Sequence, residues 1–216
     1  MNKTDLKLYA ITDRQWLQGA RLSEHVKLVI EGGATMIQIR DKDILSTDSD
    51  AGLKDEYSEA LEIKRICHEH KVPLIINDNV QFAIDIDADG VHLGQDDMNP
   101  AEARKLLGTD KIIGVTAKTV EQAKKAQADG ADYLGSGAVF GSTTKLNAKP
   151  MTKELLSEIT AAVDIPVVAI GGISADNAAT LKGTGIAGIA VVGAIFASED
   201  IKAAARELSE ICDNML

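Results

Sequence analysis

The chain has 216 residues, of which 45% are hydrophobic and only 3% aromatic, so it can form one sizeable core built mainly from Val, Ile, Leu and Ala. We therefore expect a single domain over residues 1–216. The formal charge of −10 argues against a general surface for nucleic acid or an anionic membrane, so an anionic ligand would need a local cluster of cations. The sequence shows no signal peptide, and its longest apolar stretch, residues 186–197, is too short to span a bilayer.

The two cysteines, Cys67 and Cys212, lie far apart in sequence and lack the spacing of a metal site. We expect both to be small residues of the core, as free thiols often are. This cysteine usage is typical of a reducing compartment, so we expect the protein to be cytoplasmic. The sequence does not decide its oligomeric state, and a homo-oligomer is compatible with it.

Short apolar runs, each followed by a helix-like segment, recur along the whole chain. The runs predict strands at residues 8–11, 36–39, 73–76, 90–93, 112–115, 133–134, 166–170 and 188–192. The clearest helices are predicted at residues 23–31, 54–70, 120–129, 152–163 and 201–215, and those after the third and fourth strands look short. Eight strand-helix units in this length predict an α/β fold, a single (β/α)₈ TIM barrel, with a doubly wound open sheet as the alternative.

The stretch from residue 36 to residue 42 reads M-I-Q-I-R-D-K and carries polar side chains at every second position. Gln38, Arg40 and Lys42 would share one face of this strand. An edge strand with a solvated face is the plainer explanation, but a central parallel strand that ends in a site for a bound anion fits the surrounding pattern better. The Ser-, Thr- and Asp-rich residues 45–52 are predicted to form a mobile loop after it.

Two aspartates follow neighbouring strands, where the carboxyl ends of barrel strands carry functional groups. Asp78 and Asp97 are one strand-helix unit apart, so they should face the same mouth. Mg²⁺ favours such oxygen ligands and keeps further positions for water and phosphate oxygens. The alternative is that each aspartate only caps the helix that follows it.

Two glycine-containing segments near the C-terminus suggest phosphate binding. The loop G-A-V-F-G-S-T-T-K carries hydroxyls at Ser142 and Thr144 before Lys145, although a flexible solvated loop would look the same. Gly172 ends the seventh predicted strand, and Val192 with Gly193 ends the eighth, which is the usual place for a phosphate in such barrels. A tight turn is the alternative for each glycine.

His92 lies inside the fourth predicted strand, and we interpret it as a hydrogen-bonded interior residue rather than a general base. The chain shows no ordering of Ser, His and Asp, or of Cys and His, that would indicate nucleophilic hydrolysis.

Taken together, these motifs resemble those of the thiamine-phosphate synthase family. The matching segments, in family order, are Y-A-I-T-D-R, Q-I-R-D-K, I-I-N-D, D-G-V-H-L-G-Q-D-D, G-V-T-A, T-K and A-I-G-G-I, covering residues 9–195. The resemblance implies a (β/α)₈ fold and a transferase that joins hydroxymethylpyrimidine diphosphate to hydroxyethylthiazole phosphate. The products would be thiamine phosphate and pyrophosphate, with Mg²⁺ on the diphosphate.

The resemblance also implies roles for individual residues. Catalysis would involve Arg40, Lys42, Thr116 and Lys145, and the metal would be held by Asp78 and Asp97. Substrate contacts would come from Gln38, Arg40 and Lys42 at the diphosphate, from Asn77 and Thr116 at the pyrimidine, and from Ser142, Thr144, Lys145, Gly172, Val192 and Gly193 at the remaining phosphate groups. The chain departs from the family pattern at Thr116 (usually Ser), Gly141 (usually Pro), Ser142 (usually Thr) and Gly193 (usually Ser), which affects loop rigidity and affinity for the thiazole phosphate.

Three other functions compete with this one. A thiazole tautomerase on the same barrel would not need Asp78 and Asp97, and a non-catalytic protein that binds thiamine phosphate could lose them. A sugar-phosphate epimerase would need facing acid-base or metal groups that this chain does not offer. The sequence does not decide whether a carboxylated thiazole phosphate is preferred.

Overall fold

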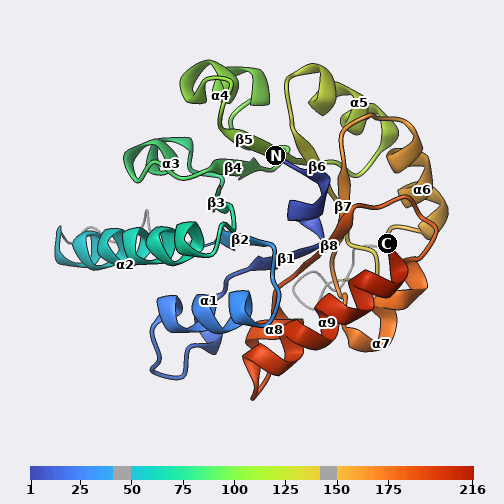
Figure 1. Cartoon of the computed structure of the whole chain (residues 1–216). Coiled ribbons are helices and arrows are strands. Elements are labelled where there is room, and N and C mark those ends of the chain that lie inside the picture. The colour runs from blue at the N-terminus through green and yellow to red at the C-terminus, as the bar shows by residue number, and fades with distance from the viewer. Residues whose placement is uncertain (41–49, 142–149) are drawn as a thin grey trace.

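The strands form a closed barrel. The computed structural model describes residues 1–40, 50–141 and 150–216, and its strands pair in the order β1 to β8, with β8 pairing back to β1. Every pairing is parallel, and helices lie on the outside of the ring (Figure 1). The (β/α)₈ prediction is therefore confirmed, and the doubly wound open sheet is wrong because a closed ring leaves no edge strand.

The strands are short and buried on both faces, as expected where helices cover a parallel sheet. They are β1 (Leu8–Ile11), β2 (Met36–Ile39), β3 (Leu74–Asn77), β4 (Gly90–Leu93), β5 (Ile112–Thr116), β6 (Tyr133–Gly137), β7 (Val167–Ile170) and β8 (Gly188–Val191). Strand β2 pairs with β1 on one side and β3 on the other. The solvated-edge explanation for its polar residues is therefore wrong.

The outer layer consists of helices and short helical turns. They are η1 (Lys3–Leu6), η2 (Arg14–Trp16), α1 (Leu22–Glu31), α2 (Asp50–Glu69), α3 (Val80–Asp85), α4 (Pro100–Leu107), α5 (Val120–Ala128), α6 (Lys153–Ala161), α7 (Ala175–Ala178), η3 (Ala179–Leu181), α8 (Gly193–Phe196) and α9 (Ile201–Met215). Side-chain caps begin several of them: Thr119 accepts from the Gln122 amide and Thr152 from the Leu155 amide. The predicted short helices after β3 and β4 are confirmed.

The loop predicted at residues 45–52 is partly wrong. Residues 45–49 lie outside the described part of the chain, but α2 already begins at Asp50 and includes Gly52. The predicted start at residue 54 was late because extending an existing helix is far easier than nucleating one, so even weak helix formers such as Asp50 and Gly52 can continue a helix whose later turns pack on the barrel.

The core has two parts, separated by the barrel wall. One lies between the strands and the helices, and it includes both free cysteines, which confirms their predicted burial. The other fills the barrel, with Tyr9, Met36, Ile75 and Tyr133 among its members. Gly114 makes room for this inner core: a Cβ atom there would lie 2.0 Å from Cζ of Tyr133.

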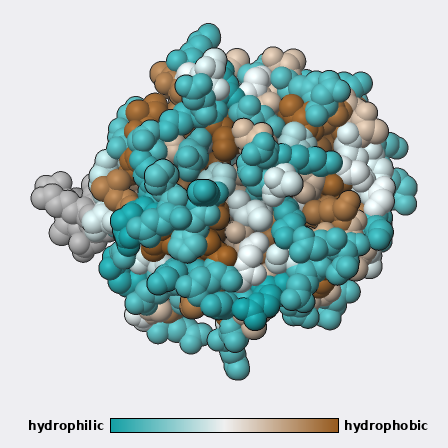
Figure 2. Space-filling model, in the orientation of Figure 1, coloured by the Kyte–Doolittle hydropathy of each residue, from teal (hydrophilic) through white to brown (hydrophobic). Residues whose placement is uncertain are grey.

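The amino-terminal end of the barrel is closed. Turn η1 lies across this end (Figure 1), its Leu6 is fully buried, and a Cβ at Gly188 would lie 1.8 Å from the Leu6 carbonyl oxygen. Figure 2 shows this face covered mostly by hydrophilic side chains, with hydrophobic residues in separate patches. Closure here leaves the opposite end, where the strands finish, as the place for a site. Among the described helices, none has the length and apolar character needed to cross a membrane.

Candidate functional site

The described residues predicted to form a site all lie at or near the carboxyl ends of the strands. Gln38 lies within β2 and Arg40 just after it; Asn77 ends β3, and Asp78 follows; Asp97 follows β4; Thr116 ends β5; Gly172 follows β7; Val192 and Gly193 follow β8. Since parallel strands of a barrel end at one rim, these residues surround a single mouth. Lys42, Ser142, Thr144 and Lys145 were predicted for the same site and lie outside the described residues.

Four of these residues form what we call the carboxylate cluster: Arg40, Asn77, Asp78 and Asp97. The side-chain amide of Asn77 donates to Oδ2 of Asp78 at 2.6 Å, and the carboxyl groups of Asp78 and Asp97 share a hydrogen bond. The positive charge of Arg40 is close enough to lower the pKa of Asp78. Residues from three neighbouring strands therefore meet at one point of the mouth.

Neither aspartate caps a helix. Helix α3 is capped by Asn79, whose side chain accepts from the Phe82 amide, and α4 is capped by Asn99, which accepts from the Ala101 amide. Asp97 instead accepts from the backbone amide of Gly94 at 2.6 Å, within its own loop. The capping explanation is therefore wrong, and both carboxylates are available for another role.

The backbone also holds Asp78 in an unusual conformation. Its φ of +61° lies in the left-handed region, which only a few per cent of residues other than glycine adopt. Its amide donates to the carbonyl oxygen of His92 at 2.8 Å, which ties this strained residue to β4. Such strain persists where the surrounding structure enforces it, and it concentrates at functional sites.

The electrostatics of the cluster suit a cation. Partial burial, followed by the hydrogen bond with Asp97 and repulsion from it, raises the pKa of Asp78 to about 6, although Asn77 and Arg40 act in the opposite direction. Two adjacent carboxylates would be relieved by a divalent metal with oxygen preference. The described residues contain no group of three or more His, Cys, Asp or Glu side chains arranged for a metal, so any remaining ligands would be water or substrate oxygens.

The raised pKa of Asp78 predicts that its charge destabilises the metal-free protein. Above pH 6 the carboxylate is ionised in both folded and unfolded states, and the folded state bears the cost; below the ordinary value of 3.8 it is protonated in both states, and the cost disappears. After allowance for solvent screening, we expect Asp78→Asn to stabilise the protein at pH 8 by about 1 kcal/mol, a rise in Tm of about 2–4 °C. The gain should shrink below pH 6 and vanish near pH 4.

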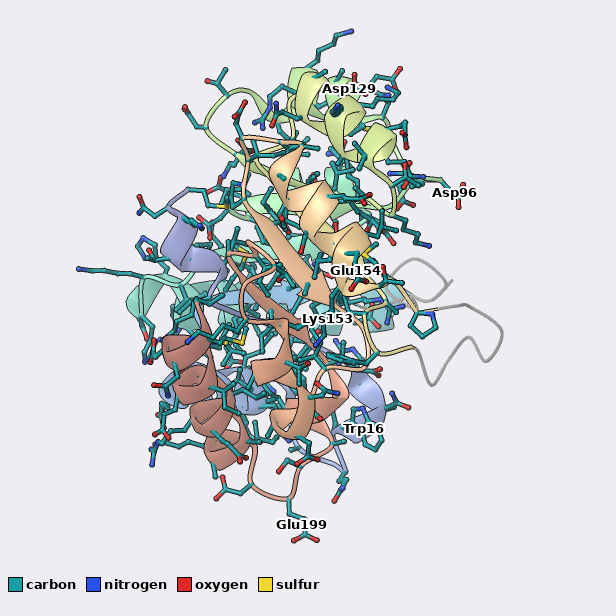
Figure 3. All side chains as sticks on the ribbon, turned by 90° about the vertical axis from the view of Figure 1, so that its right-hand side faces the viewer. Trp16, Asp96, Asp129, Lys153, Glu154 and Glu199 are labelled. Atoms are coloured by element: carbon teal, nitrogen blue, oxygen red, sulfur yellow. The ribbon has the colours of Figure 1, made fainter. Side chains whose placement is uncertain are left out.

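Thermal unfolding in the presence of a chelator, followed by circular dichroism across this pH range, measures the effect. Asp96→Asn is the matched control, because Asp96 is exposed and projects away from the body of the protein (Figure 3). A stability change for Asp78→Asn that is equal at pH 8 and pH 5 would contradict the cost assigned to the charged carboxylate, which arises from partial burial and from Asp97.

The ends of β7 and β8 form a second, less polar part of the mouth. Gly171 and Gly172 both have positive φ, +100° and +67°, and a Cβ at Gly172 would lie 2.9 Å from the carbonyl oxygen of Phe140. Residue 172 therefore has to be a glycine for backbone reasons, as the tight-turn explanation requires. Gly193 begins α8 in open space, with no heavy atom within 4 Å of a built Cβ. Exposed backbone N–H groups here could meet an anion.

The barrel interior holds a polar chain that the sequence did not reveal. Nε2 of Gln38 donates to the hydroxyl of Tyr9 at 2.5 Å, and that hydroxyl lies 2.8 Å from the hydroxyl of Tyr133. The Tyr133 hydroxyl lies 3.0 Å from Nδ1 of His92, whose Nε2 lies 3.0 Å from Oγ1 of Thr116. The amide of Gln38, only 1% exposed, is thus engaged inside the barrel.

The interior position of His92 agrees with its interpretation from sequence. Burial lowers the pKa of its imidazole to about 4, so the ring is neutral at pH 7. Burial also raises the pKa of Tyr9 and Tyr133 well above the usual tyrosine value, which keeps both hydroxyls protonated. The tyrosines were missed because their partners lie far away in sequence. The available signal was a tyrosine at an inward strand position, since a buried tyrosine hydroxyl usually finds a hydrogen-bond partner.

Comparison with known proteins places these residues in context. The sequence profile described as thiamine monophosphate synthase matches residues 8–195. A thiamine-phosphate synthase of Ruminiclostridium cellulolyticum is 47% identical over 213 residues, which cover 99% of this chain and 98% of that protein. One of Clostridium tetani is 46% identical, with 95% of each chain covered.

A solved structure shows the same arrangement in space. A thiamine phosphate pyrophosphorylase of Pyrococcus furiosus superposes with a TM-score of 0.87 at 37% identity, covering 99% of this chain and 98% of the other. The match extends over the barrel and its helices, so the similarity includes every strand that contributes a residue to the mouth.

Proposed function

The chain belongs to the thiamine monophosphate synthase family, and we propose that it is a transferase that condenses hydroxymethylpyrimidine diphosphate with hydroxyethylthiazole phosphate to give thiamine phosphate and pyrophosphate. The observation that carries this proposal is the carboxylate cluster, because its two adjacent aspartates would suit a divalent cation and Arg40 adds a positive charge at the same mouth. These are the groups that a leaving diphosphate requires.

The proposed chemistry needs no nucleophile from the protein. The bond between the pyrimidine methylene carbon and the diphosphate oxygen breaks, pyrophosphate leaves with the electron pair, and the electron-rich aminopyrimidine spreads the positive charge. The lone pair of the thiazole nitrogen then forms the new bond to that carbon. The protein contributes by stabilising the leaving charge and holding both rings in attack geometry.

At the diphosphate, Arg40 would bind the leaving group and neutralise part of its charge. Lys42 and Lys145 are proposed to join it; both lie outside the described residues. Asp78 and Asp97 would hold Mg²⁺, supported by their adjacency and by the raised pKa of Asp78. When bound, Mg²⁺ would neutralise negative charge on the diphosphate oxygens.

Asn77 and Thr116 are proposed to orient the pyrimidine, since both stand at strand ends on the inner side of the mouth. The thiazole phosphate would bind the backbone around Gly172, Val192 and Gly193, together with Ser142 and Thr144 of the undescribed segment. The open space at Gly193 would allow a phosphate to approach the backbone. The hydroxyl contact of the serine that is usual in the family is lost at this position.

A thiazole tautomerase and a non-catalytic binder of thiamine phosphate are the alternative functions. Neither of these functions requires two carboxylates that cap no helix and lie close to an arginine. A cytoplasmic location is proposed as well, because both cysteines are free and buried, as in a reducing compartment.

Incubating the purified protein with both substrates and Mg²⁺ tests the proposal directly. We expect thiamine phosphate and pyrophosphate to form in equal amounts, and chelation of the metal to abolish both. Chromatography detects the first product and a coupled phosphatase assay the second. Binding of the thiazole phosphate with no product under varied pH and metal would favour one of the two alternatives.

A further inference from the structure

The chain of hydrogen bonds inside the barrel links five strands that lie on different sides of the mouth. It runs from Gln38 on β2 through Tyr9 on β1 and Tyr133 on β6 to His92 on β4 and Thr116 on β5. Each hydroxyl and each ring nitrogen in it has a neighbour in the chain, and the two tyrosines are fully buried. Thr116, at the carboxyl end of β5, is the half-buried end.

We propose that this chain of hydrogen bonds fixes the direction of the Thr116 hydroxyl. The hydroxyl proton is then donated into the mouth, to an acceptor atom of the pyrimidine substrate. Tyr9, Tyr133 and His92 would act as positioning residues. The identity of the acceptor rests on the proposed function, whereas the direction of donation along the hydrogen bonds does not.

The number of protons available along these hydrogen bonds determines which group donates at each step. The amide nitrogen of Gln38 can only donate, so the Tyr9 oxygen accepts from it. The proton of Tyr9 then goes to its other neighbour among the described residues, the oxygen of Tyr133. Tyr133 in turn donates to Nδ1 of His92, which must be the unprotonated nitrogen of the ring.

The last bond follows from the tautomer of His92. With Nδ1 accepting, the single ring proton lies on Nε2 and is donated to Oγ1 of Thr116. Thr116 therefore receives a hydrogen bond from the interior, and its own proton remains for the mouth. Because each bond determines the next, the only alternative is complete reversal: the Gln38 amide would have to turn so that its oxygen accepts from Tyr9, and Thr116 would then donate inward and present a lone pair to the substrate.

The position of Thr116 makes this direction relevant to binding. Its strand neighbours β4, and the backbone carbonyl of His92 on β4 accepts from the amide of Asp78 in the carboxylate cluster. The backbone carbonyl of Thr116 accepts from the side chain of Gln95 at 2.5 Å, which holds the residue from the rim side. A pyrimidine carries ring nitrogens that accept hydrogen bonds, and an outward-pointing hydroxyl proton complements them.

The tautomer of His92 is measurable without substrate or activity. In two-dimensional nitrogen-proton NMR of the ¹⁵N-labelled protein, we expect Nε2 of His92 to show the shift of a protonated nitrogen and Nδ1 that of an unprotonated one at pH 7. A His92→Gln variant identifies the signals among those of the four histidines. Protonated Nδ1, or an even mixture of tautomers, would overturn the proposal.

Substitutions then test the consequence for binding. In calorimetric titration with hydroxymethylpyrimidine diphosphate and Mg²⁺, we expect Thr116→Val to raise Kd about tenfold, the effect of one lost hydrogen bond, and Thr116→Ser to stay within about twofold of the parent. Tyr133→Phe breaks the chain at a distance from the substrate. It should mix the His92 tautomers and raise Kd about threefold, since Thr116 can then also donate inward.

Tyr57→Phe is the matched control for loss of a tyrosine hydroxyl, because that hydroxyl donates to the Asp85 carbonyl on the outer surface. It should leave both the His92 tautomer and Kd unchanged. Unaltered binding in Thr116→Val would overturn the outward donation. Failure to bind the pyrimidine diphosphate in every variant, with the expected tautomer present, would instead refute the proposed function and leave the direction of the chain intact.

Discussion

Asp78→Asn is expected to lower the turnover of thiamine phosphate formation by about 100- to 1,000-fold, which corresponds to about 3–4 kcal/mol of lost transition-state stabilisation. The substitution keeps the shape of the side chain but removes the charge that would hold Mg²⁺ beside the leaving diphosphate. The same variant should be more stable than the parent above pH 6 when the metal is absent, because in the parent partial burial and then the neighbouring Asp97 destabilise the charged Asp78 carboxylate. Lower activity with higher stability is typical of a residue retained for function.

Steady-state kinetics at saturating Mg²⁺ measure the loss, with Asp96→Asn as the control that should stay within about twofold of the parent. Arg40→Ala should reduce turnover comparably, because the Arg40 guanidinium supplies positive charge within the carboxylate cluster, where it lowers the pKa of Asp78. Arg40→Lys should recover only part of it, since a point charge cannot make the paired hydrogen bonds of a guanidinium. Near-normal turnover in both Asp78→Asn and Arg40→Ala would refute the assignment of the site.

Gly114→Ala is expected to reduce the free energy of unfolding by about 3 kcal/mol. Its Cβ would lie 2.0 Å from Cζ and 2.3 Å from the hydroxyl oxygen of Tyr133, which is fully buried and has no room to retreat inside the barrel. The shift of Tyr133 that the methyl group forces would also disturb its bonds to Tyr9 and His92. Urea unfolding with linear extrapolation to water measures the change.

Gly193→Ala provides the comparison for stability. Gly193 is the first residue of α8, and a built Cβ there meets no heavy atom within 4 Å. This variant should be as stable as the parent or slightly more so, because alanine favours helix over glycine. A loss below 1 kcal/mol in Gly114→Ala would show that the barrel interior can repack around the extra methyl group.

The strand and helix pattern was predictable because local sequence carries it. Short apolar runs marked every strand, and most element ends were correct to within one or two residues. The exceptions were the end of β6, which extends to Gly137 rather than residue 134, and the start of α2, where residues 50–53 are helical although Asp50 and Gly52 are typical of a loop. Helix extension there depends on the packing of later turns, which a local pattern does not show.

The part of the candidate site that was predictable is the set of residues at or just after the strand ends. Asp78, Asp97 and Asn77 could be assigned to one mouth because parallel strands in a closed ring finish on the same side. Whether the aspartates were helix caps could not be decided, since Asn79 and Asn99 stand one or two residues away and cap equally well. Only the backbone at each helix start distinguishes them.

By itself, the sequence determined the order of strands and helices, the residues at the strand ends and the resemblance to a family, because each of these depends on neighbours along the chain. Only the tertiary structure decided which side chains meet across the barrel. Tyr9 and Tyr133 share a hydrogen bond although 124 residues separate them, and Gln38 turns inward to Tyr9. Such contacts depend on how eight strands close into a ring and stagger, and no local pattern of residues encodes that geometry.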